Sequence, residues 1–275
     1  MIDLSRFGPD SKEVFVIAEA GVNHNGNLSL AMELIDVAAK VGCNAVKFQV
    51  WNSDHVYPAE RVGIIEHAGM RSLELRRSEL KLLKAHCETR GIIFFATPDE
   101  LDDAKFLASI GVPLMKTSSH DVTNLELLRG IRELGIPTIM STGACTASER
   151  DAAIVALEPC AVLHCISAYP APLDQMCLGL IGDLVARGWP IGLSDHTIGI
   201  AAACASLALG ARIFEKHLTF NRNLPGPDHK ASATPKEIGE YVRTLRALAI
   251  GMGDGVKRIM PCEAAARAKF KGWLV

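Results

Sequence analysis

The stretches GLSDHT at residues 192–197 and EKH at residues 215–217 carry the clearest fold signal in this chain of 275 residues. Each ends a short apolar run, WPI at 189–191 and ARIF at 211–214. An apolar run of this length that begins near Pro or Gly and ends in polar residues is typical of a buried strand. The sequence therefore predicts two strands whose carboxyl ends are polar.

Two histidines stand at the ends of these predicted strands. Because side chains alternate between the faces of a strand, Ser194 and His196 are expected on one face, and so are Glu215 and His217. Two histidines at the ends of neighbouring strands fit a pair of ligands for a divalent metal. Hydrogen-bonded core histidines would give the same pattern, so spacing alone leaves both interpretations open.

The same order of strand, polar tip, amphipathic helix and Gly or Pro repeats eight times along the chain. The predicted strands centre on Val16, Val46, Phe94, Met115, Ile139, Leu163, Gly192 and Phe214. The helices are expected at 28–41, 78–90, 99–110, 124–134, 147–157, 173–187, 199–209 and 235–250. Eight βα units predict the α/β class and a closed (β/α)8 TIM barrel. A doubly wound open sheet is the rival, but GVNHNG at 21–26 does not match its glycine-rich nucleotide fingerprint.

The length fits one domain. A (β/α)8 barrel takes roughly 250 residues, so we expect a single catalytic domain over 1–275, with the barrel at about 14–251 and a short extension at 252–275. One linker, 51–71, has weak helical periodicity and is expected to be irregular. A loop that long in a compact domain is usually a functional lid or else mobile.

Composition excludes some classes of partner. The formal net charge of −2 offers no attraction to nucleic acid or an anionic membrane surface. Neither end has an apolar run long enough to cross a bilayer, and residues 1–6 lack the apolar core of a signal peptide. The eight cysteines form no Cys-x-x-Cys pair, so reduced thiols and a cytoplasmic location are expected.

Each of the eight predicted strands ends in polar side chains. The carboxyl ends of the strands are where barrel enzymes carry their chemistry. These residues are Glu19, Lys47, Gln49, Thr97, Lys116, Ser118, Ser119, Ser141, His164, Ser167, Tyr169, Ser194, His196 and His217. Two lysines among small hydroxyl groups suit a phosphate or a carboxylate. A lysine can also form a Schiff base, and Glu19 could move protons or simply pair with a lysine.

These motifs resemble those of the sialic acid synthase family. The matching stretches are IAEAGVNHNG at 17–26, AVKFQ at 45–49, LHC at 163–165, YPAP at 169–172, GLSDHT at 192–197, EKH at 215–217 and RNLPGPDH at 222–229. Together they extend over most of the chain in the family's order. The resemblance implies phosphoenolpyruvate-dependent condensation with an aldehyde sugar such as N-acetylmannosamine, giving a sialic acid-like nonulosonate and phosphate.

The resemblance also implies roles for individual residues. His196 and His217 would bind a divalent metal, manganese or magnesium, and Glu19 would handle protons or the sugar. Phosphoenolpyruvate, the co-substrate, would lie on Lys47, Thr97, Lys116, Ser119, Ser141 and Ser194. Gln49, Tyr169 and Asp228 would face the acceptor, and Asp121 and Ser167 would also bind substrate. By the same resemblance the protein is expected to be a homodimer that acts on small molecules.

The chain departs from the family pattern in several places. Family members usually carry a small C-terminal antifreeze-like domain that reaches an arginine into the partner subunit's sugar site, whereas this chain stops at Val275. The family reads Ser-Gly-Glu or Ser-Gly-Asp where this chain has Ser119, His120 and Asp121. The family has Asn, or Ser as a common variant, at Ser167. The linker after the second strand is also shorter. These departures concern the sugar half of the site.

Two other functions fit the same residues. A Schiff-base aldolase would use Lys47 or Lys116 as its nucleophile. A non-catalytic barrel would serve as a subunit or binding module.

Overall fold

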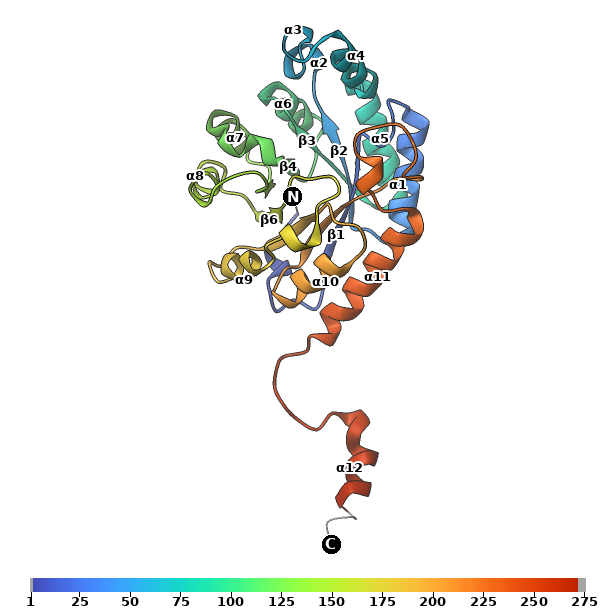
Figure 1. Cartoon of the computed structure of the whole chain (residues 1–275), viewed down its shortest axis with the longest axis vertical. Coiled ribbons are helices and arrows are strands. Elements are labelled where there is room, and N and C mark those ends of the chain that lie inside the picture. Colours follow the sequence, from blue (N-terminus) through green and yellow to red (C-terminus); the bar gives the residue numbers. More distant parts are fainter. Residues whose placement is uncertain (1, 272–275) are drawn as a thin grey trace.

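Eight parallel strands close into a barrel in chain order, as the computed structural model shows for residues 2–271 (Figure 1). The strands are β1 Phe15–Gly21, β2 Ala45–Val50, β3 Ile93–Pro98, β4 Met115–Thr117, β5 Thr138–Ser141, β6 Ala161–Cys165, β7 Ile191–Asp195 and β8 Ile213–His217. β8 pairs with β1, so the barrel has no free sheet edge. The predicted single α/β domain with a TIM barrel is confirmed, and the open-sheet alternative is wrong.

Helices connect the strands and cover the barrel. They are α1 Leu28–Val41, α5 Arg77–Arg90, α6 Leu101–Ser109, α7 Leu125–Glu133, α8 Ala147–Leu157, α9 Gly179–Val185, α10 Ala201–Ala208 and α11 Pro235–Gly251. Local chemistry sets their ends. At the start of α1, Asn27 accepts a hydrogen bond from the Leu30 amide, and Gly42 ends the helix at φ 87°.

Two of the sequence expectations about helices are wrong. Residues 51–71 are not irregular: they form α2 Ser53–Val56, α3 Ala59–Val62 and α4 Ile64–Leu73. α3 and α4 bury no residue, so they have no apolar face for helical periodicity to reveal. The helix expected at 173–187 is also shorter, because a 3-10 turn at Leu173–Gln175 precedes α9.

The barrel interior explains where the polar residues gather. Phe15, Ile17, Phe95 and Leu163 point inward and pack with Leu4 and Phe7 into an apolar plug at the amino ends of the strands. Residues two positions further along each strand face the same way. Inward positions therefore change from apolar to polar along the barrel axis, which leaves the carboxyl ends for chemistry.

The C-terminal extension lies apart from the barrel (Figure 1). It contains a 3-10 turn at Pro261–Glu263 and α12 at Ala264–Lys271. Residues 272–275 of the predicted extension lie outside the described part of the chain. Within that part, no helix is both long and apolar enough to cross a membrane.

Candidate active site

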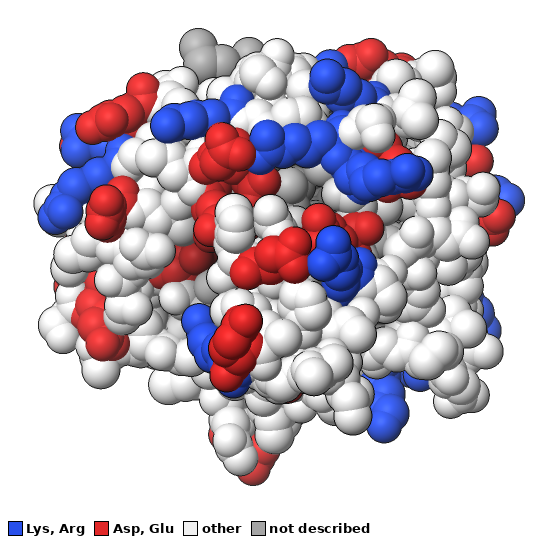
Figure 2. Space-filling model, turned by 90° about the horizontal axis from the view of Figure 1, so that it is seen from above, with Lys and Arg blue, Asp and Glu red and all other residues white. Residues whose placement is uncertain are grey.

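A cavity of about 290 Å³ opens at the carboxyl ends of the strands. Figure 2 views the molecule from above Figure 1, the side on which α2–α4 lie, and shows several acidic side chains near the middle of this face. The residues that line the cavity are Glu19, Lys47, Gln49, Tyr57, Thr97, Asp99, Lys116, Ser118, Ser119, His120, Ser141, Ala144, Cys165, Ser167, Tyr169, Ser194, His196, Glu215 and His217. Each strand contributes, so the cavity is a product of the closed barrel.

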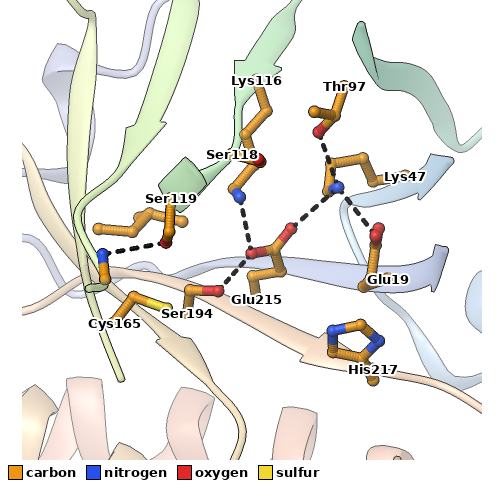
Figure 3. Close-up of polar contacts among 12 residues, drawn as sticks. Glu19, Lys47, Thr97, Lys116, Ser118, Ser119, Cys165, Ser194, Glu215 and His217 are labelled. Atoms are coloured by element: carbon orange, nitrogen blue, oxygen red, sulfur yellow. Dashed lines mark hydrogen bonds and ion pairs between the residues drawn. The ribbon is translucent and has the colours of Figure 1, made fainter. Parts of the chain in front are cut away.

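The floor of the cavity is a buried ion-pair network (Figure 3). Lys47 Nζ lies 2.9 Å from Glu19 Oε1 and donates to Thr97 Oγ1 at 2.9 Å. It also lies 3.5 Å from Glu215 Oε1. Lys116 Nζ approaches the other oxygen of Glu215 at 3.3 Å. Glu215 therefore bridges two lysines that come from different strands.

The two carboxylates of the floor differ in protonation. Burial would raise the pKa of Glu215, but Lys116 and Lys47 hold it well below its usual value. Ser194 donates a 2.7 Å hydrogen bond to Glu215 Oε2 and favours the same charged form. Burial raises the pKa of Glu19, and the negative charge of Glu215 adds to this, against the opposing effect of Lys47. Glu19 is thus the carboxylate that exchanges protons near neutral pH, while Glu215 stays ionised.

Free hydrogen-bonding atoms remain in this buried floor. Glu19 Oε2 and Ser141 Oγ are buried without a hydrogen-bond partner, and Glu215 Oε1 makes no hydrogen bond beside its ion pair with Lys47. Burying a polar atom without a partner costs free energy. A ligand that donates to the carboxylate oxygens and accepts from the Ser141 hydroxyl would satisfy these atoms.

His196 and His217 stand together beside this floor, with ring centroids 5.4 Å apart. His196 Nδ1 lies 2.8 Å from the Ile166 carbonyl oxygen, which makes Nδ1 the protonated nitrogen and leaves Nε2 with a lone pair. Burial and the neighbouring His196 hold the pKa of His217 well below its usual value, and its buried Nδ1 has no hydrogen-bond partner. The ring of Tyr169 packs on both histidines, with centroid distances of 4.1 Å to His196 and 5.7 Å to His217.

The histidine pair therefore fits a divalent metal on donor chemistry. His217 offers a neutral nitrogen, which is the form that coordinates a cation. Burial would lower the pKa of His196, but Cys165 and the Ile166 carbonyl raise it, so a cation on its Nε2 would displace a proton. Within residues 2–271, no group of three or more His, Cys, Asp or Glu side chains is arranged to hold a metal. The protein would supply two ligands, and water or substrate would supply the rest.

The residues between the inward positions form a second network on the outer side of the barrel. Lys216 Nζ lies 3.0 Å from Asp195 Oδ2 and donates to the Thr197 carbonyl oxygen. Tyr241 of α11 donates to the same Asp195 oxygen at 3.2 Å. The predicted alternation of faces at the ends of β7 and β8 is confirmed.

The cavity collects most of the predicted site residues, whose roles stay predictions. His164 lies outside its lining, with Nε2 2.6 Å from the Met176 carbonyl oxygen, and so do two of the residues that were given a substrate role. Asp121 is buried behind the rim and accepts a hydrogen bond from the Ser118 amide at 2.9 Å. Asp228 Oδ2 lies 3.5 Å from His217 Nδ1, at the edge of the histidine pair.

Sequence reasoning missed several lining residues. Glu215 could have been included, because it shares a strand face with His217. Tyr57 belongs to the segment expected to be irregular, and no periodic pattern marks it. Asp99 and His120 follow strands β3 and β4 in turns whose path the sequence does not show.

Comparisons with known proteins agree with this geometry. A family model described as the NeuB family matches residues 34–257. The N,N'-diacetyllegionaminic acid synthase of Campylobacter jejuni is 35% identical over 271 residues, which are 92% of this chain and 81% of that protein. The N-acetylneuraminate-9-phosphate synthase of Homo sapiens is 31% identical over 272 residues, 93% of this chain and 76% of that protein.

A solved structure is also similar. The N-acetylneuraminic acid (sialic acid) synthetase from Leptospira borgpetersenii, in complex with citrate, matches with a TM-score of 0.85 and 36% identity. The match covers 94% of this chain and 92% of that chain. Likeness therefore extends over the whole barrel.

Proposed function

The chain belongs to the NeuB family of sugar acid synthases, and from this premise we propose that it condenses phosphoenolpyruvate with an aldehyde sugar. The products would be a sialic acid-like nonulosonate and inorganic phosphate. N-acetylmannosamine and related sugars are the acceptors to try first. The synthase would act as a cytoplasmic homodimer on small molecules, without nucleic acid or membrane as a partner.

The lysine floor is the observation that carries this proposal. Lys47 and Lys116 are 2% and 5% exposed, yet both face the cavity. The two lysine side chains come from different strands and converge on Glu215, so they bring cationic groups to one place in the cavity. Phosphoenolpyruvate brings a carboxylate and a phosphate, which would accept hydrogen bonds from the two lysines and from the unpartnered Ser141 hydroxyl. The hydroxyl groups of Thr97, Ser119, Ser141 and Ser194 would complete the contacts.

The proposed reaction gives each of these groups a role. C3 of phosphoenolpyruvate attacks the aldehyde carbon, positive charge develops at C2, and water adds there. Phosphate leaves from the resulting tetrahedral carbon by C–O cleavage. Glu19 would move the proton, and the two lysines would balance the phosphate charge throughout. A manganese or magnesium ion on His196 and His217 would supply Lewis-acid polarisation of the aldehyde oxygen.

The acceptor side is expected around the histidine pair. Gln49 donates to Glu19 Oε1 at 3.2 Å, so its carbonyl oxygen remains for a sugar hydroxyl. Tyr169 and Ser167 line the cavity wall beside the histidine pair, and Asp228 Oδ2 lies 3.5 Å from His217 Nδ1. These positions would orient the aldehyde against phosphoenolpyruvate.

The charge state of Lys47 opposes the Schiff-base alternative. Burial would lower its pKa, but Glu19 and Glu215 raise it above its usual value. A lysine nucleophile needs a lowered pKa and a neutral amine. Lys47 is therefore better suited to hold an anion than to attack a carbonyl.

Phosphate release from phosphoenolpyruvate tests the proposal. The purified protein with manganese and a panel of aldehyde sugars should release phosphate with at least one of them. Borohydride trapping with a carbonyl substrate should give no adduct. Trapping on Lys47 or Lys116 would favour the aldolase, and phosphoenolpyruvate binding without release for any sugar would favour a non-catalytic binding module.

A further inference from the structure

The segment between β8 and α11 contains a buried histidine. Among residues 220–230, all of them within the described chain, only His229 is buried. Its exposed fraction is 0%, whereas its neighbours Asp228 and Lys230 are half-buried and exposed. An imidazole ring tolerates such burial only where its nitrogens have hydrogen-bond partners. The partners of His229 therefore show what the ring connects.

Both ring nitrogens of His229 have partners, and these partners belong to different loops. Nδ1 lies 2.7 Å from Thr219 Oγ1, just after the end of β8. Nε2 lies 3.2 Å from Asn25 Oδ1, in the loop that follows β1. Because β8 pairs with β1, these loops meet where the barrel closes. His229 is thus a bridge between the first and the last strand connection.

The backbone of the same segment packs directly on the ring of His229. Gly226 has φ 144°, a conformation that residues with a side chain rarely adopt. A Cβ atom added at Gly226 would lie 2.8 Å from His229 Cδ2, which is too close for two carbon atoms. Glycine therefore allows the chain to pass against the ring, and the ring is enclosed on several sides.

A second group of hydrogen bonds fixes the backbone of Asp228, the residue before His229. Asn23 Nδ2 donates to the Leu218 carbonyl oxygen at 2.9 Å and to Ser232 Oγ at 2.8 Å. Ser232 Oγ in turn donates to the carbonyl oxygen of Asp228 at 2.7 Å. The loops after β1 and β8 are therefore joined on both sides of Asp228.

The carboxylate of Asp228 lies beside the active site. Its Oδ2 is 3.5 Å from His217 Nδ1, and the side chain is 16% exposed. A Cβ atom added at Gly21, the last residue of β1, would lie 3.5 Å from Asp228 Oδ2 and 3.1 Å from Glu19 Oε1. Both carboxylates are therefore next to Gly21, and Asp228 lies where the histidine pair meets the floor of the cavity.

We propose that His229 is a positioning residue, which bridges Thr219 and Asn25 and thereby holds the Asp228 carboxylate beside His217. This inference rests on the proposed function, in which Asp228 faces the acceptor sugar. His229 is fully buried and does not line the cavity, so it acts through Asp228 and does not touch the substrate. A binding group that is misplaced by about 1 Å can cost about a hundredfold in rate.

His229→Ala and Thr219→Val test the bridge from its two ends. The first change removes the ring, and the second removes the hydroxyl group with little change in shape. We expect KM for an accepted sugar to rise about tenfold or more in His229→Ala and several-fold in Thr219→Val, while KM for phosphoenolpyruvate stays within about twofold. His229→Asn should recover part of the loss, because Asn carries a polar atom near the position of ring Nδ1.

A double-mutant cycle decides whether His229 acts through Asp228. If it does, His229→Ala should add little to the loss of kcat/KM that Asp228→Ala causes alone. Additive losses would overturn the inference. The cycle of Thr219→Val with Asp228→Ala gives the same decision if His229→Ala does not fold.

Arg212→Met is the matched control for a general loss of stability. Arg212 is 3% exposed and donates to the carbonyl oxygens of Ser11 and Leu207, at the amino end of β8. The change should lower the free energy of unfolding, because it leaves buried carbonyl groups unpaired. KM for the sugar should stay the same. A rise as large as that of His229→Ala would overturn the inference, since lost stability alone would then explain it.

A crystal structure of Thr219→Val separates this inference from the proposed function. We expect the Asp228 carboxylate to lie farther from His217 by about 1 Å or more, with His217 itself in place. An unchanged Asp228 carboxylate would overturn the inference. If the proposed function fails, the wild type too will release no phosphate with any sugar, and the position of Asp228 will still decide for or against the bridge.

Discussion

Glu215 is the residue on which the floor of the cavity depends. It lies between Lys47 and Lys116 and accepts from Ser194, with 3% of its surface exposed. Glu215→Gln leaves the two lysines without their shared counter-charge, and breaking such a buried pair costs about 3 kcal/mol or more. We expect the free energy of unfolding, measured in urea, to fall by this amount, and phosphate release to fall at least about a hundredfold.

Ser194→Ala is the matched control for this change. It removes one hydrogen bond to Glu215 and no charge, so the loss should be about 1–2 kcal/mol. A Glu215→Gln variant as stable as the Ser194→Ala variant would contradict the network described for the floor.

His217 tests the histidine pair. His217→Ala removes a buried ring whose Nδ1 makes no hydrogen bond in the protein, so phosphate release that depends on manganese should disappear. Manganese binding by calorimetry should weaken about a hundredfold, because one of two protein ligands is lost. His55→Ala, at an exposed position near Glu100, serves as control. Full activity of the His217 variant would contradict the proposal that His217 is a metal ligand.

Asp103 gives a prediction about pH. Burial raises its pKa to about 6, although Arg77 donates to it at 3.0 Å, and its second oxygen is buried without a partner. The folded state therefore holds the proton of the Asp103 carboxyl more tightly than the unfolded state does. The contribution of Asp103 to the free energy of unfolding should fall as pH rises from about 4 to about 6. Asp103→Asn cannot titrate.

The measurement is the free energy of unfolding of both proteins at pH 4, 5, 6 and 7. The difference, wild type minus Asp103→Asn, should fall across this window and stay level above it. A difference that rises with pH would show that Arg77, not burial, controls Asp103.

At the scale of elements, the ends of β7 and β8 carry a network on each side. The inner one holds Ser194 and Glu215, and the outer one pairs Lys216 with Asp195 at 3.0 Å. Lys216→Met should cost about 3–5 kcal/mol, because it leaves the buried Asp195 charge unpaired. The double variant Lys216→Met, Asp195→Asn should cost much less than the sum of the single changes. Additive losses in a urea double-mutant cycle would argue against direct coupling.

Strand alternation is also the level at which the sequence was most informative. Inward positions such as Ile17 and Glu19 follow the two-residue period, so the barrel and most of the cavity lining could be predicted from it. Glu215 obeyed the same rule and could have been found. Tyr57 and His120 could not, because they lie in the insertion and in a turn after β4, where the path of the chain depends on tertiary contacts. The helices α3 and α4 could not be predicted for a related reason, since helices that bury no residue leave no periodic hydrophobic pattern in the sequence.

At the scale of the whole molecule, the barrel and the C-terminal extension are unequal parts. Every residue from 251 to 270 is exposed, whereas the apolar plug and the inward faces of the covering helices are buried. Deleting residues 252–275 should therefore change the free energy of unfolding by less than about 1 kcal/mol, since surface segments contribute little. Phosphoenolpyruvate affinity, measured by calorimetry, should stay the same because residues 252–271, the described part of the extension, do not line the cavity. Circular dichroism melting of the full chain and of the shortened chain at equal concentration provides the comparison. A large fall in melting temperature, or lost phosphoenolpyruvate binding, would mean that the extension packs on a barrel in solution, as it would between the subunits of the proposed homodimer.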